Sequence, residues 1–147
     1  MLHLMCLKVN LLLIDVKHTN FLPLKAMQKP KILIIDDEKE ICSLLKEYFE
    51  EDGFIVSCSH EGLEGVEKVK SLDPSIILLD MRMPGMSGNE ALKKIKELTP
   101  SPVLCVSAVI DNKMVEECLQ NGAYAYVFKP INLEDLSQLI ESALKAE

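Results

Sequence analysis

The sequence predicts a doubly wound α/β fold, in which helices cover both faces of a parallel sheet. From residue 31 onward, short apolar runs alternate with stretches whose apolar residues have helical spacing. The short runs are apolar throughout, which is typical of strands buried on both faces. Strands that alternate with helices form parallel sheets, because each connection crosses one face of the sheet.

The first half of this pattern predicts three strands and two helices. In chain order they are the strand Lys31–Asp37, the helix Glu38–Asp52, the strand Phe54–Cys58, the helix Glu61–Leu72 and the strand Ser75–Asp80. The first and third strands are apolar runs that end in acids. Gly53 predicts the end of the first helix, and Leu63, Val66 and Val69 lie on one side of the second.

The second half predicts three helices and two strands. They are the helix Ser87–Leu98, the strand Pro102–Ser107, the helix Asp111–Asn121, the strand Tyr124–Phe128 and the helix Leu133–Lys145. Asp111 and Asn132 are candidate N-caps, and Gly122 predicts a helix end. Right-handed crossovers at this length favour the flavodoxin-like (βα)5 topology with strand order 2-1-3-4-5.

Composition excludes several classes of protein. The 147 residues, 48% hydrophobic and 27% charged, predict one globular domain. No apolar run reaches the roughly 18 residues that a membrane span needs. The net charge of −7 and the absence of Trp argue against a nucleic-acid surface. The five cysteines include no CxxC pair, so we expect core thiols in a reducing cytoplasm rather than a disulfide scaffold or a zinc site.

The first 29 residues lack this periodicity. We expect residues 1–29 to be an N-terminal extension, either poorly ordered or the result of a start site upstream of Met27. A functional anchor helix or an added strand is the alternative interpretation. Residues 30–147 then form the folded domain.

Polar residues follow four of the predicted strands at their carboxyl ends. They are Asp36 and Asp37 after the first strand, Asp80 after the third, Ser107 after the fourth and Lys129 after the fifth. Each alone is an ordinary cap or turn residue. Together they lie at the edge where open parallel sheets bind ligands, beside the point at which the strand order reverses.

These residue types favour phosphoryl chemistry. Three carboxylates repel one another and need a cation, and oxygen ligands without a nearby His favour Mg²⁺ over zinc. A carboxylate can also act as a nucleophile and form an aspartyl phosphate. A lysine and a hydroxyl could then hold the phosphoryl oxygens.

The motifs resemble the receiver domain of bacterial two-component response regulators. The matching segments are KILIIDD from Lys31, LLDMRMPGMSG from Leu78, Ser107 after its apolar strand, and NGAYAYVFKP from Asn121. The resemblance covers about residues 29 to 146. It implies a phosphoacceptor signalling module rather than an enzyme that turns over an external substrate.

The resemblance also implies roles for individual residues. Asp80 is the phosphoacceptor; Asp37 and Asp80 bind Mg²⁺ directly, Asp36 acts largely through water, and the backbone carbonyl of Arg82 completes the protein ligands. In addition, Lys129 pairs with the phosphoryl group or Asp80, Ser107 moves toward the phosphate, and the bond from Lys129 to Pro130 is cis. Tyr126 is the aromatic switch residue by resemblance, although on the residues alone it is a partly buried strand aromatic.

The implied partners are a sensor histidine kinase or a histidine phosphotransfer protein, together with an unknown output protein. Glu40, Ile41 and Leu44 of the first helix are candidates for the docking face, although Ile41 and Leu44 also fit its core stripe. A pseudo-receiver that binds proteins without phosphorylation is the alternative function. A flavodoxin-like redox carrier would need a phosphate-binding loop where Asp36-Asp37-Glu38 stands, and a haloacid-dehalogenase-like hydrolase would need a DxD pair on the first strand.

Arg82 and Val109 lie two residues after Asp80 and Ser107. Neither side chain is a carboxylate or an amide that would readily position an attacking water. We therefore expect slow self-dephosphorylation, unless both side chains point to solvent.

Overall fold

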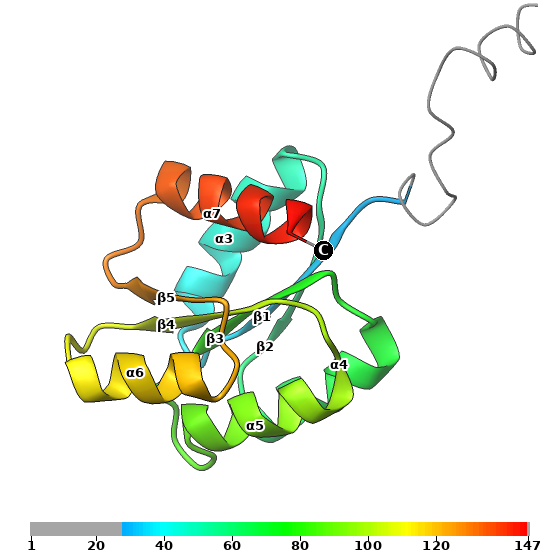
Figure 1. Cartoon of the computed structure of the whole chain (residues 1–147). Coiled ribbons are helices and arrows are strands. Elements are labelled where there is room, and N and C mark those ends of the chain that lie inside the picture. Colours follow the sequence, from blue (N-terminus) through cyan, green and yellow to red (C-terminus); the bar gives the residue numbers. More distant parts are fainter. Residues whose placement is uncertain (1–27, 147) are drawn as a thin grey trace, which may run out of the picture.

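The computed structural model describes residues 28–146, and Figure 1 shows the arrangement of its elements. The strands are β1 (Lys31–Ile35), β2 (Ile55–Ser59), β3 (Ile76–Asp80), β4 (Val103–Ser107) and β5 (Ala125–Phe128). The helices are α3 (Lys39–Glu51), α4 (Gly62–Leu72), α5 (Gly88–Leu98), α6 (Asn112–Gln120) and α7 (Leu133–Lys145). Residues 1–27 of the expected N-terminal extension lie outside the described residues.

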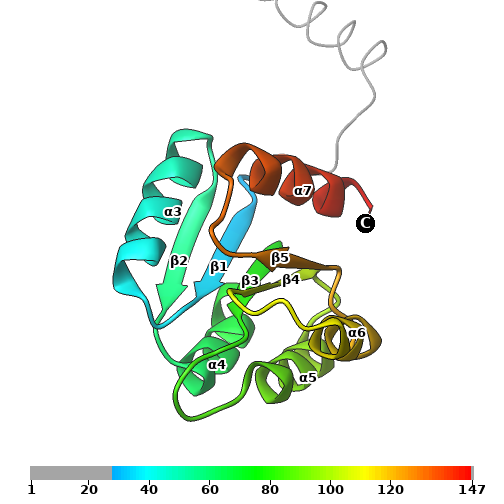
Figure 2. The same cartoon turned by 90° about the vertical axis from the view of Figure 1, so that its left-hand side faces the viewer.

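The five strands form one parallel sheet in the order β2-β1-β3-β4-β5, which confirms the predicted topology. Helices α3 and α7 cover one face, and α4, α5 and α6 cover the other (Figures 1 and 2). Along β1, Ile32 and Ile34 pack into the core under α3 and α7, whereas Leu33 and Ile35 pack into the core under the other three helices. All four side chains are buried, as expected for a strand covered on both faces.

Helix ends lie within a residue or two of their predicted positions. The side chain of Asp111 accepts a hydrogen bond from Lys113 N, and that of Asn132 accepts one from Asp135 N, so both predicted N-caps are confirmed. Gly53 and Gly122 follow their helices with positive φ angles of 95° and 97°, which glycine adopts without strain.

Two leucines that share a helix side with core residues are exposed, and for Leu44 this favours the docking interpretation over the core one. In α3, Leu45 and Phe49 are buried but Leu44 is 55% exposed, and in α4 Leu63 is 57% exposed beside buried Val66 and Val69. The apolar stripe of each helix is therefore narrower than the sequence spacing indicated. Among the helices that the structure describes, none combines the length and the apolar character needed to span a bilayer.

Candidate functional site

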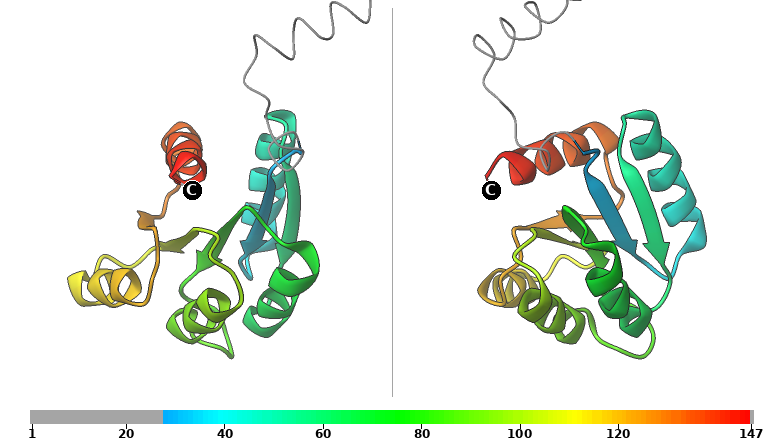
Figure 3. Two further views of the ribbon diagram at one scale, coloured as in Figure 1. Left: turned by 45° about the vertical axis from the view of Figure 1, so that its right-hand side comes forward. Right: turned by 90° about the vertical axis from the view of Figure 1, so that its right-hand side faces the viewer.

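The carboxyl ends of four strands meet at one edge of the sheet, where Figure 3 shows the strand tips converging. Asp36 follows β1, Asp80 ends β3, Ser107 ends β4 and Lys129 follows β5. Asp36 and Asp80 are each 4% exposed and Ser107 is 1% exposed. Two carboxyl groups and a hydroxyl are thus withdrawn from water at the point where the strand order reverses.

The two buried carboxylates use their oxygens in the same way. Asp36 Oδ1 accepts a hydrogen bond of 2.9 Å from Glu38 N, and Asp80 Oδ1 accepts one of 3.1 Å from Arg82 N. In each case the donor is the backbone two residues further on, so the side chain closes the turn that leaves the strand. The Oδ2 atoms of both residues face Lys129.

The ammonium of Lys129 lies among three carboxylates. Its Nζ is 3.2 Å from Asp36 Oδ2, 3.0 Å from Glu38 Oε1 and 3.6 Å from Asp80 Oδ2. Burial alone would lower the pKa of Lys129, but the hydrogen bond to Glu38 and the charges of Asp80 and Asp36 raise it overall. Its backbone N–H donates to Ser107 O at 2.9 Å, and its bond to Pro130 is cis, as expected.

Asp80 is the acid with the most perturbed ionisation at this edge. Burial raises its pKa to about 6, and the nearby Asp36 adds to the rise, whereas the Arg82 N–H and Lys129 oppose it. Three carboxylates face a single lysine here, so the site carries an excess of negative charge. Such a site favours a bound cation.

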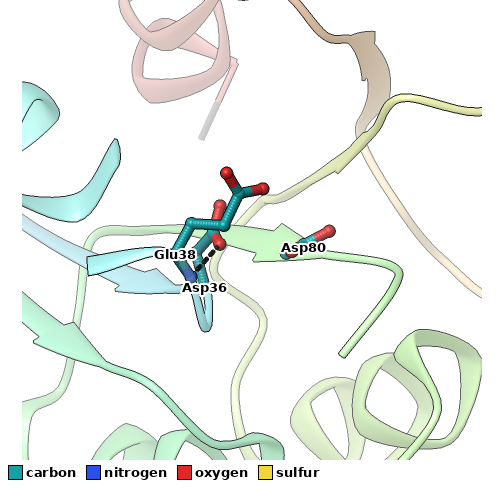
Figure 4. Close-up of side chains that lie close together, drawn as sticks. All are labelled: Asp36, Glu38 and Asp80. Atoms are coloured by element: carbon teal, nitrogen blue, oxygen red, sulfur yellow. Dashed lines mark hydrogen bonds between the residues drawn. The ribbon is translucent and has the colours of Figure 1, made fainter. Parts of the chain in front are cut away.

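The carboxylates of Asp36, Glu38 and Asp80 are close enough to serve one metal ion. Each offers an oxygen, and these oxygens all lie within 4.8 Å of one another (Figure 4). Hard oxygen donors of this kind suit Mg²⁺. Sequence reasoning missed Glu38, although it continues the acidic run of Asp36 and Asp37.

Asp37 and Arg82 lie differently from the buried acids. Asp37 is exposed and borders a neighbouring hollow lined by His60, Leu63 and Met86. The side chain of Arg82 is also exposed, while its backbone N–H is engaged by Asp80. The expected ligand roles of the Asp37 carboxylate and the Arg82 carbonyl remain predictions.

Ser107 and Tyr126 are linked through one backbone residue. Val109 N donates a 3.2 Å hydrogen bond to Ser107 Oγ, and Tyr126 OH donates to Val109 O at 3.3 Å. The Tyr126 hydroxyl also lies 3.3 Å from Met114 Sδ, and its ring packs against Phe128 with the centroids 5.2 Å apart. Tyr126 is partly buried, as the sequence indicated, and burial raises its pKa.

Comparison with known proteins gives a consistent result. A family model described as "Response regulator receiver domain" matches residues 32–141. Sporulation initiation phosphotransferase F of Bacillus subtilis is 32% identical over 119 residues, which cover 80% of this chain and 96% of that protein. Regulatory protein AtoC of Escherichia coli is 33% identical over 118 residues, which cover 80% of this chain and 26% of that protein. The chain spans only 26% to 53% of AtoC, YkoG and ZraR.

Solved structures show the same fold. A CheY-like receiver domain protein of Methanospirillum hungatei matches with a TM-score of 0.79 and 30% identity, over 81% of this chain and 96% of that one. A chain of the CheX-CheY-BeF3-Mg²⁺ complex of Borrelia burgdorferi matches with a TM-score of 0.72 and 31% identity, over 77% of this chain and 87% of that one. The family match covers 110 of 147 residues and includes the whole acidic edge. The chain therefore belongs to the response regulator receiver domain family, a class of signalling module.

Proposed function

We propose that this protein is a phosphoacceptor response regulator, and that Asp80 accepts a phosphoryl group from a histidine kinase or a histidine phosphotransfer protein. The observation that carries this proposal is the arrangement of Asp80 at the end of β3. The side chain is held by one backbone hydrogen bond through Oδ1, and its Oδ2 faces the Lys129 ammonium at 3.6 Å. A fixed carboxylate with one oxygen toward a cation suits attack on a phosphoryl group.

In the proposed transfer, Asp80 Oδ2 attacks the phosphorus of a phosphohistidine. An O–P bond forms, the N–P bond breaks, and its electron pair stays on the imidazole nitrogen of the donor. Lys129 stabilises charge on the phosphoryl oxygens, and Asp36 and Glu38 hold Lys129 in place at 3.2 Å and 3.0 Å. Asp80 must be ionised to attack, so we expect transfer to slow below about pH 6.

We further propose that the acidic edge holds Mg²⁺. Asp36 and Asp80 belong both to the ligand set predicted from the sequence and to the carboxylate cluster of the structure. The family resemblance adds Asp37 and the Arg82 carbonyl as ligands. The geometry of the cluster adds Glu38. When bound, Mg²⁺ supplies positive charge that offsets the carboxylates and the transferred phosphoryl group. The solved CheX-CheY-BeF3-Mg²⁺ complex of Borrelia burgdorferi holds Mg²⁺, which supports this assignment.

The proposed signal leaves the site through Ser107, Val109 and Tyr126. A Ser107 hydroxyl that turns toward a phosphoryl group releases Val109 N, and Val109 O is the acceptor of the Tyr126 hydroxyl. Movement of Tyr126 would alter the surface of β5 and α6. The chain contains no Trp, so the Tyr126→Trp variant carries a single fluorophore there. We expect phosphorylation to change its emission, and unchanged emission would contradict the switch role.

The donor protein is proposed to dock on α3. Leu44 is 55% exposed on this helix, which begins directly after the acidic turn, and Glu40 is exposed one turn before it. An exposed leucine on the helix that follows the acidic turn is a suitable anchor for a helical partner. The relative named Sporulation initiation phosphotransferase F supports a donor of the phosphotransfer class.

The test is intact mass after incubation with acetyl phosphate, with and without Mg²⁺. We expect the wild type to gain one phosphoryl group in a magnesium-dependent reaction. The Asp80→Asn variant should gain none, whereas Asp111→Asn, which changes an exposed capping acid, should behave as the wild type. A folded wild type that binds Mg²⁺ but accepts no phosphoryl group from acetyl phosphate or from histidine donors would favour the pseudo-receiver function.

A further inference from the structure

Four cysteines of the described chain form two strand–helix pairs on opposite faces of the sheet. Cys58 of β2 meets Cys42 of α3 in the core under α3 and α7, and Cys105 of β4 meets Cys118 of α6 in the core on the other face. All four are free thiols. Cys105 and Cys118 are completely buried, whereas Cys58 is partly exposed on β2, an edge strand beside α3 (Figure 2). Cys42 is also buried, so among these four thiols only Cys58 can be reached from solvent.

The accessible pair has close contacts that include a histidine. Cys58 Sγ lies 3.8 Å from Cys42 O, and Cys42 Sγ lies 3.7 Å from His60 Nδ1. Cys42 Sγ also donates to Asp36 O at 3.3 Å, and His60 Nδ1 lies 3.0 Å from the same oxygen. The pair therefore joins the edge of the sheet to the backbone of the acidic turn.

We propose that Cys58 and Cys42 form an oxidisable dithiol, which a peroxide converts into a disulfide. The Cys58 thiolate attacks a peroxide oxygen, the O–O bond breaks, and hydroxide leaves to give a sulfenic acid on Cys58. The Cys42 sulfur then attacks Cys58, the S–S bond forms, and the S–O bond breaks with release of water. Two thiols lose two electrons, and one hydrogen peroxide is reduced to two waters.

The surroundings of Cys58 support its place as the attacking thiol. Contact with the Cys42 thiol lowers the pKa of Cys58, against the effect of burial, and Lys46, His60 and Lys68 lower it further. The same contact, together with burial, raises the pKa of Cys42, which therefore stays protonated as the second thiol of the pair. A lowered pKa gives Cys58 a larger thiolate fraction at neutral pH than an ordinary cysteine has. Burial raises the pKa of Cys105, so the second pair is both enclosed and protonated.

The disulfide has a consequence for the acidic edge, which rests on the proposed function. Oxidation removes the Cys42 proton that is donated to Asp36 O, two bonds from the carboxylate-bearing Cα of Asp36. The turn that directs Asp36 Oδ2 at Lys129 then loses one of its supports. We expect the oxidised protein to accept a phosphoryl group several-fold more slowly than the reduced protein.

The test uses the full chain with a Cys6→Ser background, treated with hydrogen peroxide and digested with trypsin without reduction. We expect a linked product that joins the peptide 40–46 to the peptide 47–68 and that disappears on reduction. The Cys58→Ser variant should give no link, and Cys105→Ser, the matched control in the enclosed pair, should still give it. Unlinked Cys58 oxidised to sulfinic acid, or a link between Cys105 and Cys118 formed equally fast, would overturn the proposal.

A second measurement separates this proposal from the proposed function. The rate of phosphoryl acceptance from acetyl phosphate is compared for reduced, oxidised and re-reduced protein. A reduced protein that accepts no phosphoryl group contradicts the proposed function and leaves the peptide test valid. A reduced protein that accepts it, with an equal rate after confirmed oxidation, refutes the coupling. Cys58→Ser should accept a phosphoryl group as fast as the reduced wild type. If peroxide treatment no longer slows this variant, the coupling is supported.

Discussion

The polar groups at the amino edge and at the carboxyl edge of the sheet have different kinds of partner. At the amino edge, Ser101 Oγ donates to Pro74 O at 2.7 Å, Lys31 N donates to Ser75 Oγ at 3.0 Å, and Lys31 Nζ donates to Leu72 O at 3.1 Å. Each donor there has a neutral acceptor. At the carboxyl edge, the three carboxylates of Asp36, Glu38 and Asp80 share the single ammonium of Lys129.

This difference separates structural from functional polarity. Buried groups that are matched one to one stabilise the fold and leave nothing to offer a ligand. An excess of negative charge around two buried carboxylates costs stability, and it is tolerated where a cation or a phosphoryl group binds there. Substitutions at the two edges should therefore act on different observables, and the predictions below test that separation.

The largest effect is expected from replacing Lys129, with Lys31 at the opposite edge as its control. Lys129→Met removes the cation beside Asp80, and we expect phosphoryl acceptance from acetyl phosphate to fall on the order of 100-fold. Lys31→Met removes the cation at the opposite edge, and the rate should stay within about twofold of the wild type, because the hydrogen bonds of Lys31 to Ser75 and Leu72 are to neutral groups. Circular dichroism confirms folding of both variants. Equal losses of rate would show that the effect is not specific to the acidic edge.

The next effect is on stability and depends on pH. The pKa of Asp80 is raised to about 6 in the folded protein, above its ordinary value of 3.8. The protonated form is favoured by folding, so the wild type is destabilised as the pH rises through 6. Without divalent cations, Asp80→Asn should be more stable than the wild type by about 1–3 kcal/mol at pH 8, and the advantage should vanish below about pH 4. Urea unfolding at the two pH values measures it, and an advantage that grows in acid would contradict the sign.

Two buried serines give the most direct comparison of the edges. Ser101→Ala leaves Pro74 O without its donor and should lower the free energy of unfolding by about 1–2 kcal/mol, with phosphorylation unchanged. Ser107 Oγ accepts from the Val109 N–H, which Ser107→Ala can leave to another acceptor, so we expect Ser107→Ala to cost less than this. It should, however, uncouple phosphorylation from the emission change of Tyr126→Trp in the double variant. If Ser101→Ala also abolished the emission change of Tyr126→Trp on phosphorylation, the assignment of the two edges would be contradicted.

The sequence predicted the fold and most of the acidic edge for a simple reason. An apolar run predicts a buried strand, and the polar residue at its end, Asp36, Asp80 or Ser107, marks the carboxyl end of that strand. Because the carboxyl ends of parallel strands share one edge of the sheet, these residues are expected to lie together. The pattern could not show that Glu38 reaches Lys129, since helix-start residues carry no periodic signal, or that Leu44 is exposed within an apolar stripe. It also could not pair Cys42 with Cys58, because that contact joins a helix to a strand 16 residues away.

The smallest effect is expected at Arg82, which lies two residues after Asp80 with its side chain exposed. Arginine has no acceptor that could orient a water for attack on an aspartyl phosphate, whereas an asparagine has both a donor and an acceptor. Arg82→Asn should therefore shorten the lifetime of the phosphorylated protein a few-fold, while the rate of phosphoryl acceptance changes little. Loss of the phosphoryl adduct, followed by intact mass after removal of acetyl phosphate, measures this lifetime. Arg82→Lys is the control, because it keeps the charge and adds no acceptor. A wild-type adduct that decays within seconds and is not shortened by Arg82→Asn would show that this position does not govern hydrolysis, and that the exposed side chain belongs to the surface rather than to the acidic edge.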